Sequence, residues 1–259
     1  MQRVIDGNHD TTLLKVIAGI CMVIDHIGAR LFPRIMELRI IGRIAFPLYV
    51  WCLIVGACYT RSAWKYALRL LLAGLISQPF YMLGLNHGWD RLNVFATLLT
   101  GYLGIVGMQK KRYGSQFWAP LAAIAFSCAV KVDYGWRGVL LIMLIYLVRR
   151  RREAVAALMI AFCLFWGINS ALIQQICGIG LQGRFFDLDP VKGFLRLQAL
   201  AILALPLILW RRECRLPARH KRLAYAVYPA HLLILWLVEL GTGVMTVQQS
   251  MHLLIPWWM

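Results

Sequence analysis

The chain has 259 residues, of which 61% are hydrophobic and 15% are charged, and its formal net charge is +17. Soluble domains are about 45–50% apolar even when glycine is counted, so this composition excludes an ordinary soluble domain. The basic residues stand in short gaps between long apolar runs, as in cytoplasmic loops of membrane proteins. The positive charge therefore indicates a membrane protein and not nucleic-acid binding.

Apolar runs of the length that crosses a bilayer, about 20 residues, recur along the chain. They predict a single all-α domain over residues 1–259, a polytopic integral membrane helix bundle with about nine transmembrane helices. The predicted spans are 13–32, 40–59, 64–85, 92–108, 117–132, 134–149, 153–173, 195–210 and 223–240. Residues 244–259 are either an interfacial segment or part of a tenth helix.

The first run is too long for a signal peptide, carries two polar residues and lacks a cleavage site, so we expect a membrane helix. Lys15 and His26 lie eleven residues apart in it. This is about three helical turns, so the two side chains share a face and are separated by about 16 Å. A cation at the membrane surface and a buried imidazole suit a ligand with an anionic head and a reactive tail, such as acyl-CoA. A flanking anchor and a structural histidine are the equally weighted alternative.

Asp25 precedes His26, but adjacent residues on a helix do not face each other. We therefore do not expect the Asp25 carboxylate to orient the imidazole. A charged carboxylate at this depth needs its own partner, for which Arg43 or Arg30 is suitable.

Arg61, Lys65 and Arg69 recur every four residues at the start of the third run and form one stripe. Snorkelling toward water explains Arg61 and Lys65, but Arg69 falls within the apolar run. We interpret Arg69, together with Lys15, as a phosphate contact.

Further polar side chains interrupt the apolar runs, and charged or polar groups in such places are functional candidates. Those on the predicted outer side are interpreted as lining an acceptor site near His26, although each alone is more typical of a structural polar pair. They are Arg39, Arg43, Asn93, Thr97, Asp133, Tyr134 and Arg137. The ninth run carries Tyr228, Pro229, which we expect to kink the helix, and a second imidazole, His231.

Lys and Arg predict the orientation. The N-terminus and every second loop hold about 18 of the 28 basic residues, so the positive-inside rule places the N-terminus in the cytoplasm. The seven cysteines form no C-x-x-C pair, so we expect small buried side chains and no metal site.

Six segments resemble the TraX family and occur in the family's order: LKVIAGICMVIDHIG, RIIGRIAFPLYVW, WKYALRLLLAGLISQPF, NVFATLLTGYLG, DYGWRGVLLIMLIY and YAVYPAHLLIL. They cover the chain from Leu14 to about Leu240. The most specific pieces are Asp25–His26, Gly42–Arg43 with Phe46–Pro47, and Tyr228 with His231.

The resemblance implies a bacterial inner-membrane acetyltransferase related to the wider transmembrane acyltransferases, in which a basic residue, ten intervening residues and a histidine mark the first helix. That pattern maps onto Lys15 and His26. It implies acetyl-CoA as the donor and an acceptor at the outer face, either a pilin N-terminal amine or a glycan. The resemblance does not extend to the long polar N-terminal extension of pilin acetylases, so it leaves the acceptor open.

The residue assignments follow from both lines of reasoning. They are His26 and Asp25 for catalysis; Lys15, Arg69, Arg43, Tyr228 and His231 for acetyl-CoA binding; and Arg39, Asn93, Asp133 and Tyr134 for the acceptor. Two alternatives remain: a proton-coupled transporter using Asp25, His26 and His231, and a non-catalytic membrane scaffold.

Overall fold

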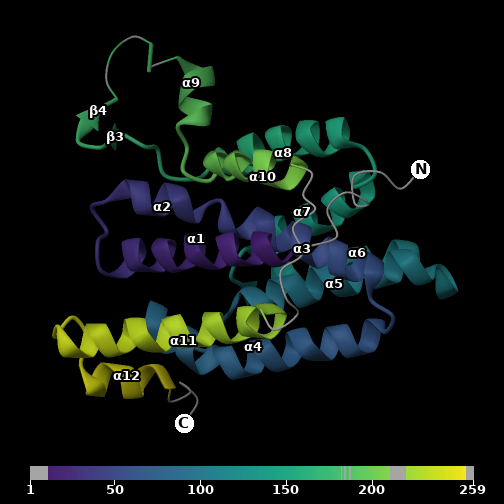
Figure 1. Cartoon of the computed structure of the whole chain (residues 1–259), viewed down its shortest axis with the longest axis horizontal. Helices are drawn as coiled ribbons and strands as arrows, with labels where there is room; N and C mark the ends of the chain where they lie inside the picture. Colours follow the sequence, from purple (N-terminus) through teal and green to yellow (C-terminus); the bar gives the residue numbers. More distant parts are fainter. Residues whose placement is uncertain (1–10, 182, 184, 187, 211–219, 255–259) are drawn as a thin grey trace. The chain divides into compact units, whose positions relative to one another are not determined.

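The structure is a computed structural model that describes residues 11–181, 183, 185–186, 188–210 and 220–254, with side chains described from residue 226 in the last range. These residues form an all-α fold with two short two-stranded ladders (Figure 1). The α-helices are α1 (Thr12–Arg30), α2 (Met36–Gly42), α3 (Ala45–Tyr59), α4 (Ala63–Leu85), α5 (Val94–Lys110), α6 (Ser115–Ala129), α7 (Gly135–Val148), α8 (Arg152–Gly167), α9 (Asp189–Phe194), α10 (Leu205–Leu209), α11 (His220–Gly241) and α12 (Val247–Leu254). The 3-10 helices are η1 (Arg112–Gly114) and η2 (Ala199–Ala204), and the strands are β1 (Arg91–Leu92), β2 (Lys131–Val132), β3 (Gln175–Ile176) and β4 (Ile179–Gly180).

Each of the predicted runs contains a helix, which confirms the all-α class. Within the part of the chain that the structure describes, three helical segments are long and apolar enough to cross a membrane, namely Thr12–Arg30, Met36–Tyr59 and Ala63–Leu85. Several others are shorter than 18 residues, so about nine full spans are not confirmed. The described part of the C-terminal segment, α12, has eight residues and rises only about 12 Å, too little to span a bilayer alone.

Two predicted spans are less regular than expected. In the run 153–173, α8 ends at Gly167, where the Ser170 hydroxyl donates to the Gly167 carbonyl oxygen at 2.8 Å. A side-chain bond of this kind gives the last carbonyls a partner other than the next helical turn. The run 195–210 begins as the 3-10 helix η2 and continues as the short helix α10.

The chain divides into two compact units. Unit 1 comprises Met1–Cys52 and Leu147–Pro217, and unit 2 comprises Leu53–Tyr146 and Ala218–Met259.

In unit 1, α1 packs along α2 (Figure 1). Two glycines allow this close approach, because a Cβ at Gly28 would stand 2.6 Å from the Cβ of Leu38. A Cβ at Gly42 would stand 2.2 Å from the Asp25 side chain. Helix α8 packs on η2 at a third glycine, Gly167, where an added Cβ would lie 3.0 Å from the Ala199 Cβ. Small residues at such contacts are typical of helix packing in membranes.

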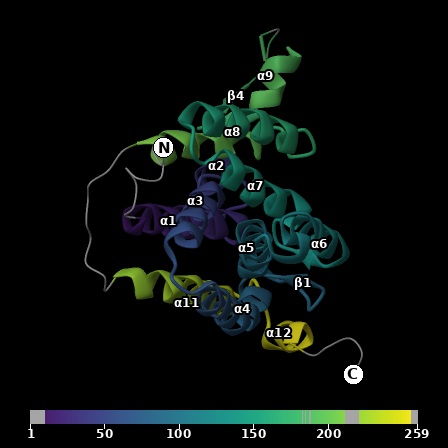
Figure 2. The same cartoon turned by 90° about the vertical axis from the view of Figure 1, so that its right-hand side faces the viewer.

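In unit 2, α5 packs against α4 and α6, and both α11 and α12 pack against α4 (Figures 1 and 2). Gly84 brings α4 against α11, since a Cβ there would lie 2.7 Å from the Leu232 carbonyl oxygen. The N-terminus of α5 is capped by Asn93, whose side chain accepts from the Phe95 amide at 3.0 Å. Next to it, β1 pairs in parallel with β2, with Leu92 opposite Val132.

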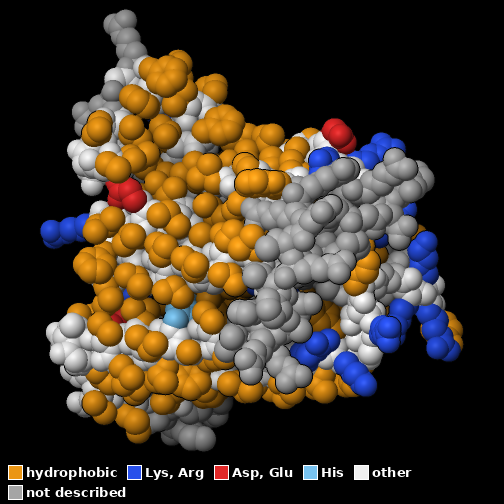
Figure 3. All heavy atoms as spheres, viewed as in Figure 1, with side chains coloured by type: hydrophobic (Ala, Val, Ile, Leu, Met, Phe, Trp, Pro, Cys, Tyr) orange, Lys and Arg blue, Asp and Glu red, His pale blue; other side chains and the backbone are white. Residues whose placement is uncertain are grey.

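The surface of the units is that of a membrane protein. On α4 the exposed side chains include Leu68, Leu71, Leu72, Leu75 and Ile76. Hydrophobic side chains cover much of the face in Figure 3. A continuous exposed apolar surface is unfavourable in water and expected against lipid. The chain is therefore a helical membrane protein, as its composition predicts.

Candidate functional site

The predicted site residues divide between the two units. Unit 1 contains Lys15, Asp25, His26, Arg39 and Arg43, whereas unit 2 contains Arg69, Asn93, Asp133, Tyr134, Tyr228 and His231.

The centre of the unit 1 group is the buried carboxylate of Asp25. Arg43 Nη2 lies 2.7 Å from both Asp25 oxygens, and Arg39 Nη1 lies 2.9 Å from Oδ1. The pair predicted between Asp25 and Arg43 is thus confirmed, while Arg39, expected to face the acceptor, is a second partner of the same carboxylate. Charge-assisted bonds of this length are the strongest hydrogen bonds available to a carboxylate.

Further bonds hold the two guanidinium groups in place. Arg39 Nη1 also donates to the Asp25 carbonyl oxygen at 3.1 Å, and Arg43 Nε donates to the Arg39 carbonyl oxygen at 3.3 Å. Arg43 Nη1 donates to Oε1 of Gln198 at 3.2 Å, which links the cluster to the residue before η2. One carboxylate with two guanidinium groups leaves a net positive charge beside α1.

Gly42 is essential to this geometry. It lies one residue before Arg43, and its missing side chain is the space that the Asp25 carboxyl group occupies. Helix α2 ends there, and the backbone continues through Arg43 into α3 with helical dihedral angles. Gly42 therefore leaves room for the Asp25 carboxylate, and Arg43, the next residue, is the cation that binds it.

His26 and Lys15 both lie within the single helix α1. The helix is continuous between them, so they share a face as the spacing predicts. His26 is half-buried, whereas its neighbour Asp25 is buried and turned to α2. Adjacent residues diverge by about 100° around a helix, so the carboxylate positions α2 and not the imidazole.

Lys15 lies at the start of α1, in the neighbourhood of the buried Cys52 thiol of α3. The Lys15 amide donates to the Thr11 carbonyl oxygen, and the Cys52 Sγ lies 3.8 Å from that same oxygen. Lysine, thiol and first helical turn thus meet at one end of α1.

Unit 2 holds a second polar cluster. The Tyr81 hydroxyl of α4 donates to Asp133 Oδ1 at 3.0 Å. The Tyr228 hydroxyl of α11 lies near both Asp133 and Tyr81. The Tyr228 and His231 rings stand 5.5 Å apart at 68°, and His231 Nδ1 donates to the Val227 carbonyl oxygen at 2.8 Å. Asp133, Tyr228 and His231, which the sequence analysis singled out, therefore share one cluster.

The β1–β2 ladder brings Asp133 and Tyr134 to this cluster. It places the residues after Val132 beside the start of α5, where the Tyr134 amide donates to Thr97 Oγ1 at 3.4 Å.

Asn93 and Arg69 have local roles in the structure. Besides capping α5, the Asn93 amide group donates to the Gly74 carbonyl oxygen at 2.8 Å and to Gln78 Oε1 at 2.9 Å. These bonds engage both ends of the Asn93 side chain in helix capping and in α4–α5 packing. Arg69 is exposed, and its guanidinium lies 5.3 Å from the Tyr66 ring centroid.

Two residues of these clusters were not predicted from the sequence. Gln198 lies 155 positions from Arg43, and no local pattern relates them. Tyr81 lies four positions after Ser77 among apolar residues, so the two side chains share a face of α4. This polar face was the signal in the sequence that could have identified Tyr81. Its partner Asp133 is 52 positions away, which helical periodicity cannot show.

The geometry of the unit 1 cluster predicts a large loss of stability for Asp25→Asn. The substitution leaves two partly buried guanidinium groups without their anion, and breaking a buried pair costs about 3–5 kcal/mol. Thermal denaturation in detergent measures the effect. Asp90→Asn is the matched control, because the Asp90–Lys131 pair is exposed and should change the midpoint little. Equal midpoints for the two variants would contradict the structural importance of the cluster.

Comparison with known proteins assigns the chain to a family. Residues 10–239 match the model of the family described as "TraX protein". A probable fimbrial assembly protein FimC, serogroup H1, from Dichelobacter nodosus is 45% identical over 73 residues, which are 26% of this chain and 30% of that protein. The uncharacterized protein RP591 of Rickettsia prowazekii (strain Madrid E) is 44% identical over 68 residues, 26% of this chain and 25% of that protein.

Both of these matches span less than a third of the relative's own length. No solved structure matches the chain. The family match is different, because it extends from just before α1 to near the end of α11 and contains both polar clusters. It confirms the resemblance found in the six sequence segments: the chain belongs to the TraX protein family.

Proposed function

We propose that this protein is a membrane-embedded acetyltransferase that moves an acetyl group from acetyl-CoA to an acceptor at the outer membrane face. The observation that carries the proposal is the arrangement on α1. One face of the helix holds Lys15 and His26 about 16 Å apart, and a buried carboxylate with two arginines anchors the same helix against α2.

His26 is the proposed base of the reaction. Its imidazole removes a proton from the acceptor amine or hydroxyl while that group attacks the thioester carbonyl. The new bond joins the acceptor to the acetyl carbon, the carbon–sulfur bond breaks, and the coenzyme thiolate leaves and is protonated. In a second form of the mechanism the imidazole attacks first and carries the acetyl group to the acceptor.

The Asp25 cluster supports this chemistry indirectly. Its net positive charge lies beside the helix that carries His26, and positive charge stabilises the oxyanion that forms when a thioester carbonyl is attacked. The α1–α2 contact also holds the helix that carries the imidazole. Asp25 is accordingly a positioning residue, and Lys15 is the proposed contact for the coenzyme phosphates.

The acceptor and the sidedness belong to the same proposal. The Dichelobacter nodosus relative is named as a fimbrial assembly protein, which supports a pilin N-terminal amine as acceptor; a glycan hydroxyl is the other class considered. The excess of Lys and Arg in alternate loops supports a bacterial inner-membrane location with a cytoplasmic N-terminus. The donor then approaches from the cytoplasm and the acceptor from outside.

A proton-coupled transporter is the alternative of a different class. It draws on His231 and the Tyr81–Asp133 bond, since buried polar groups in membranes also form proton paths. Proton flux in proteoliposomes without any acyl donor would favour it over the acetyltransferase.

His26→Ala is expected to reduce acetyl transfer at least about 100-fold, the usual contribution of general acid–base catalysis, or abolish it. Purified protein incubated with labelled acetyl-CoA and cell extract measures the transfer. His252→Ala is the matched control, since it removes an exposed imidazole of α12. Transfer within a few-fold of the unsubstituted protein, with normal thermal stability, would make His26 structural.

Lys15→Ala is expected to raise the KM for acetyl-CoA more than it lowers kcat, because phosphate contacts are made in the ground state as well as in the transition state. Arg69→Ala separately tests the second phosphate contact predicted from the sequence. Calorimetry with free CoA measures the affinities, and Arg61→Ala, which removes an exposed cation outside the apolar run, is the control. Unchanged affinity in both variants would place the phosphates elsewhere.

Sidedness is tested with single cysteines on a background without the natural ones. Arg34 lies exposed in the turn between α1 and α2, and Lys111 lies exposed between α5 and α6. Arg34→Cys should react with a membrane-impermeant thiol reagent in intact cells, whereas Lys111→Cys should react only after lysis. The reverse pattern would exclude transfer to an acceptor outside.

A further inference from the structure

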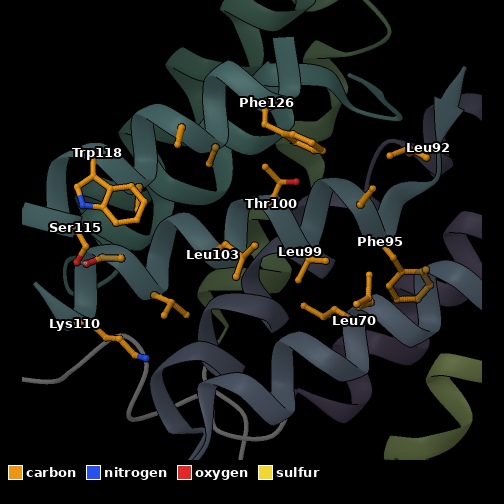
Figure 4. A pocket seen from close by; sticks show the side chains of 18 of the residues that line it. Leu70, Leu92, Phe95, Leu99, Thr100, Leu103, Lys110, Ser115, Trp118 and Phe126 are labelled. Carbon is orange, nitrogen blue, oxygen red and sulfur yellow. Dashed lines mark hydrogen bonds between the residues drawn. The ribbon is translucent and has the colours of Figure 1, made fainter. Parts of the chain in front are cut away.

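Unit 2 contains a groove that the proposed reaction does not use. It is a cavity of about 780 Å³ lined by α4, α5 and α6 (Figure 4). Leu99 and Leu103 of α5 lie in the middle of its length, and Leu70 of α4 and Phe126 of α6 contribute to its sides (Figure 4). Sites of this volume hold ligands the size of a small organic molecule or one hydrocarbon chain.

The groove exists because small residues line it where helices meet. Gly74 of α4 and Ala96 of α5 contribute no long side chain, and neither do Ala119 and Ala122 of α6. Gly107 lets α5 and α6 close at one end, because a Cβ there would stand 2.3 Å from the Ala119 Cβ. Because the groove is lined by apolar side chains, a hydrocarbon chain fills it more favourably than water or a polar group does.

The groove is long and runs along α5. On α5 its lining extends from Phe95 to Lys110, which is fifteen residue-to-residue steps of helix or about 22 Å. The hydrocarbon core of a bilayer is about 30 Å thick, so a chain that follows α5 over this length matches most of that thickness. An extended acyl chain has this shape, whereas a compact polar substrate does not.

The two ends of the groove differ in charge. Lys110 and Arg112 line one end, while Gln78 and Asn93 line the other, and the described lining residues include no Asp or Glu. Figure 4 shows Lys110 at the end opposite Leu92. The cationic end favours an anion, and the apolar length favours a hydrocarbon chain attached to it.

The cationic end is also built as a membrane interface. The Arg112 guanidinium lies 4.9 Å from the Tyr113 ring centroid, and Trp118 Nε1 donates to the Tyr113 carbonyl oxygen at 3.1 Å. Tyrosine and tryptophan concentrate at the headgroup level of a bilayer. Basic side chains at the same level attract anionic lipids.

We propose that this groove is a binding site for an anionic glycerophospholipid. One acyl chain lies along α5 past Leu103 and Leu99, and the headgroup phosphate is held by Lys110 and Arg112. A zwitterionic lipid of the same chains fits the apolar length, but its headgroup carries a cation that Lys110 and Arg112 repel. The proposal is independent of the acetyltransferase activity.

The test uses two photoactivatable lipids with identical chains, phosphatidylglycerol and phosphatidylcholine, each with the reactive group on one acyl chain. The purified full-length protein is irradiated in nanodiscs, and mass spectrometry measures labelling of the peptides from α4, α5 and α6. We expect several-fold more labelling by the phosphatidylglycerol probe. Equal labelling by the two probes would overturn the proposal.

Two substitutions locate the site. Lys110→Gln combined with Arg112→Gln should remove the preference for the anionic probe, whereas Lys65→Gln, an exposed lysine outside the groove, should preserve it. Ala122→Phe should fill the groove and reduce labelling by both probes. Leu121→Phe changes a neighbouring exposed residue outside the lining and should not. An unchanged preference in the double variant, or equal labelling of Ala122→Phe and the unsubstituted protein, would exclude this groove.

Discussion

The buried carboxylate of Asp25 is the interaction on which unit 1 depends. A charge in an apolar helix is unfavourable unless a partner of opposite sign accompanies it, and here Arg39 and Arg43 both do so at hydrogen-bond distance. This requirement fixes α2 against α1, requires glycine at position 42 and connects Gln198 to the cluster. The same contact holds α1, the helix that carries His26, against α2.

Unit 2 satisfies a similar requirement in another way. Its central carboxylate, Asp133, accepts a hydrogen bond from the Tyr81 hydroxyl, and the Tyr81 ring centroid lies 5.0 Å from that of His87. The short β1–β2 ladder positions this carboxylate, because strand pairing places the loop after α6 beside the start of α5. On α4 and α5, small residues produce close helix contacts on one side and an open groove on another.

Several features were predictable because they depend on short stretches of chain. Apolar run length indicated where helices form, and the eleven-residue spacing placed Lys15 and His26 on one face of α1. The need for a partner of Asp25 pointed to Arg43, one of the two candidates considered. Family membership, too, was visible in the order of six short segments.

The sequence by itself thus determined the membrane class, the helical content, the family and the polar residues that interrupt the apolar runs, since each follows from local composition or spacing. The tertiary structure decided which of those residues meet. Arg39 binds Asp25, and Asn93 caps a helix. Gln198 and Tyr81 bind partners to which helical periodicity does not relate them. The physical reason is that a buried charge or hydrogen-bonding group takes whichever partner packing brings within about 3 Å, and packing joins residues far apart in the chain.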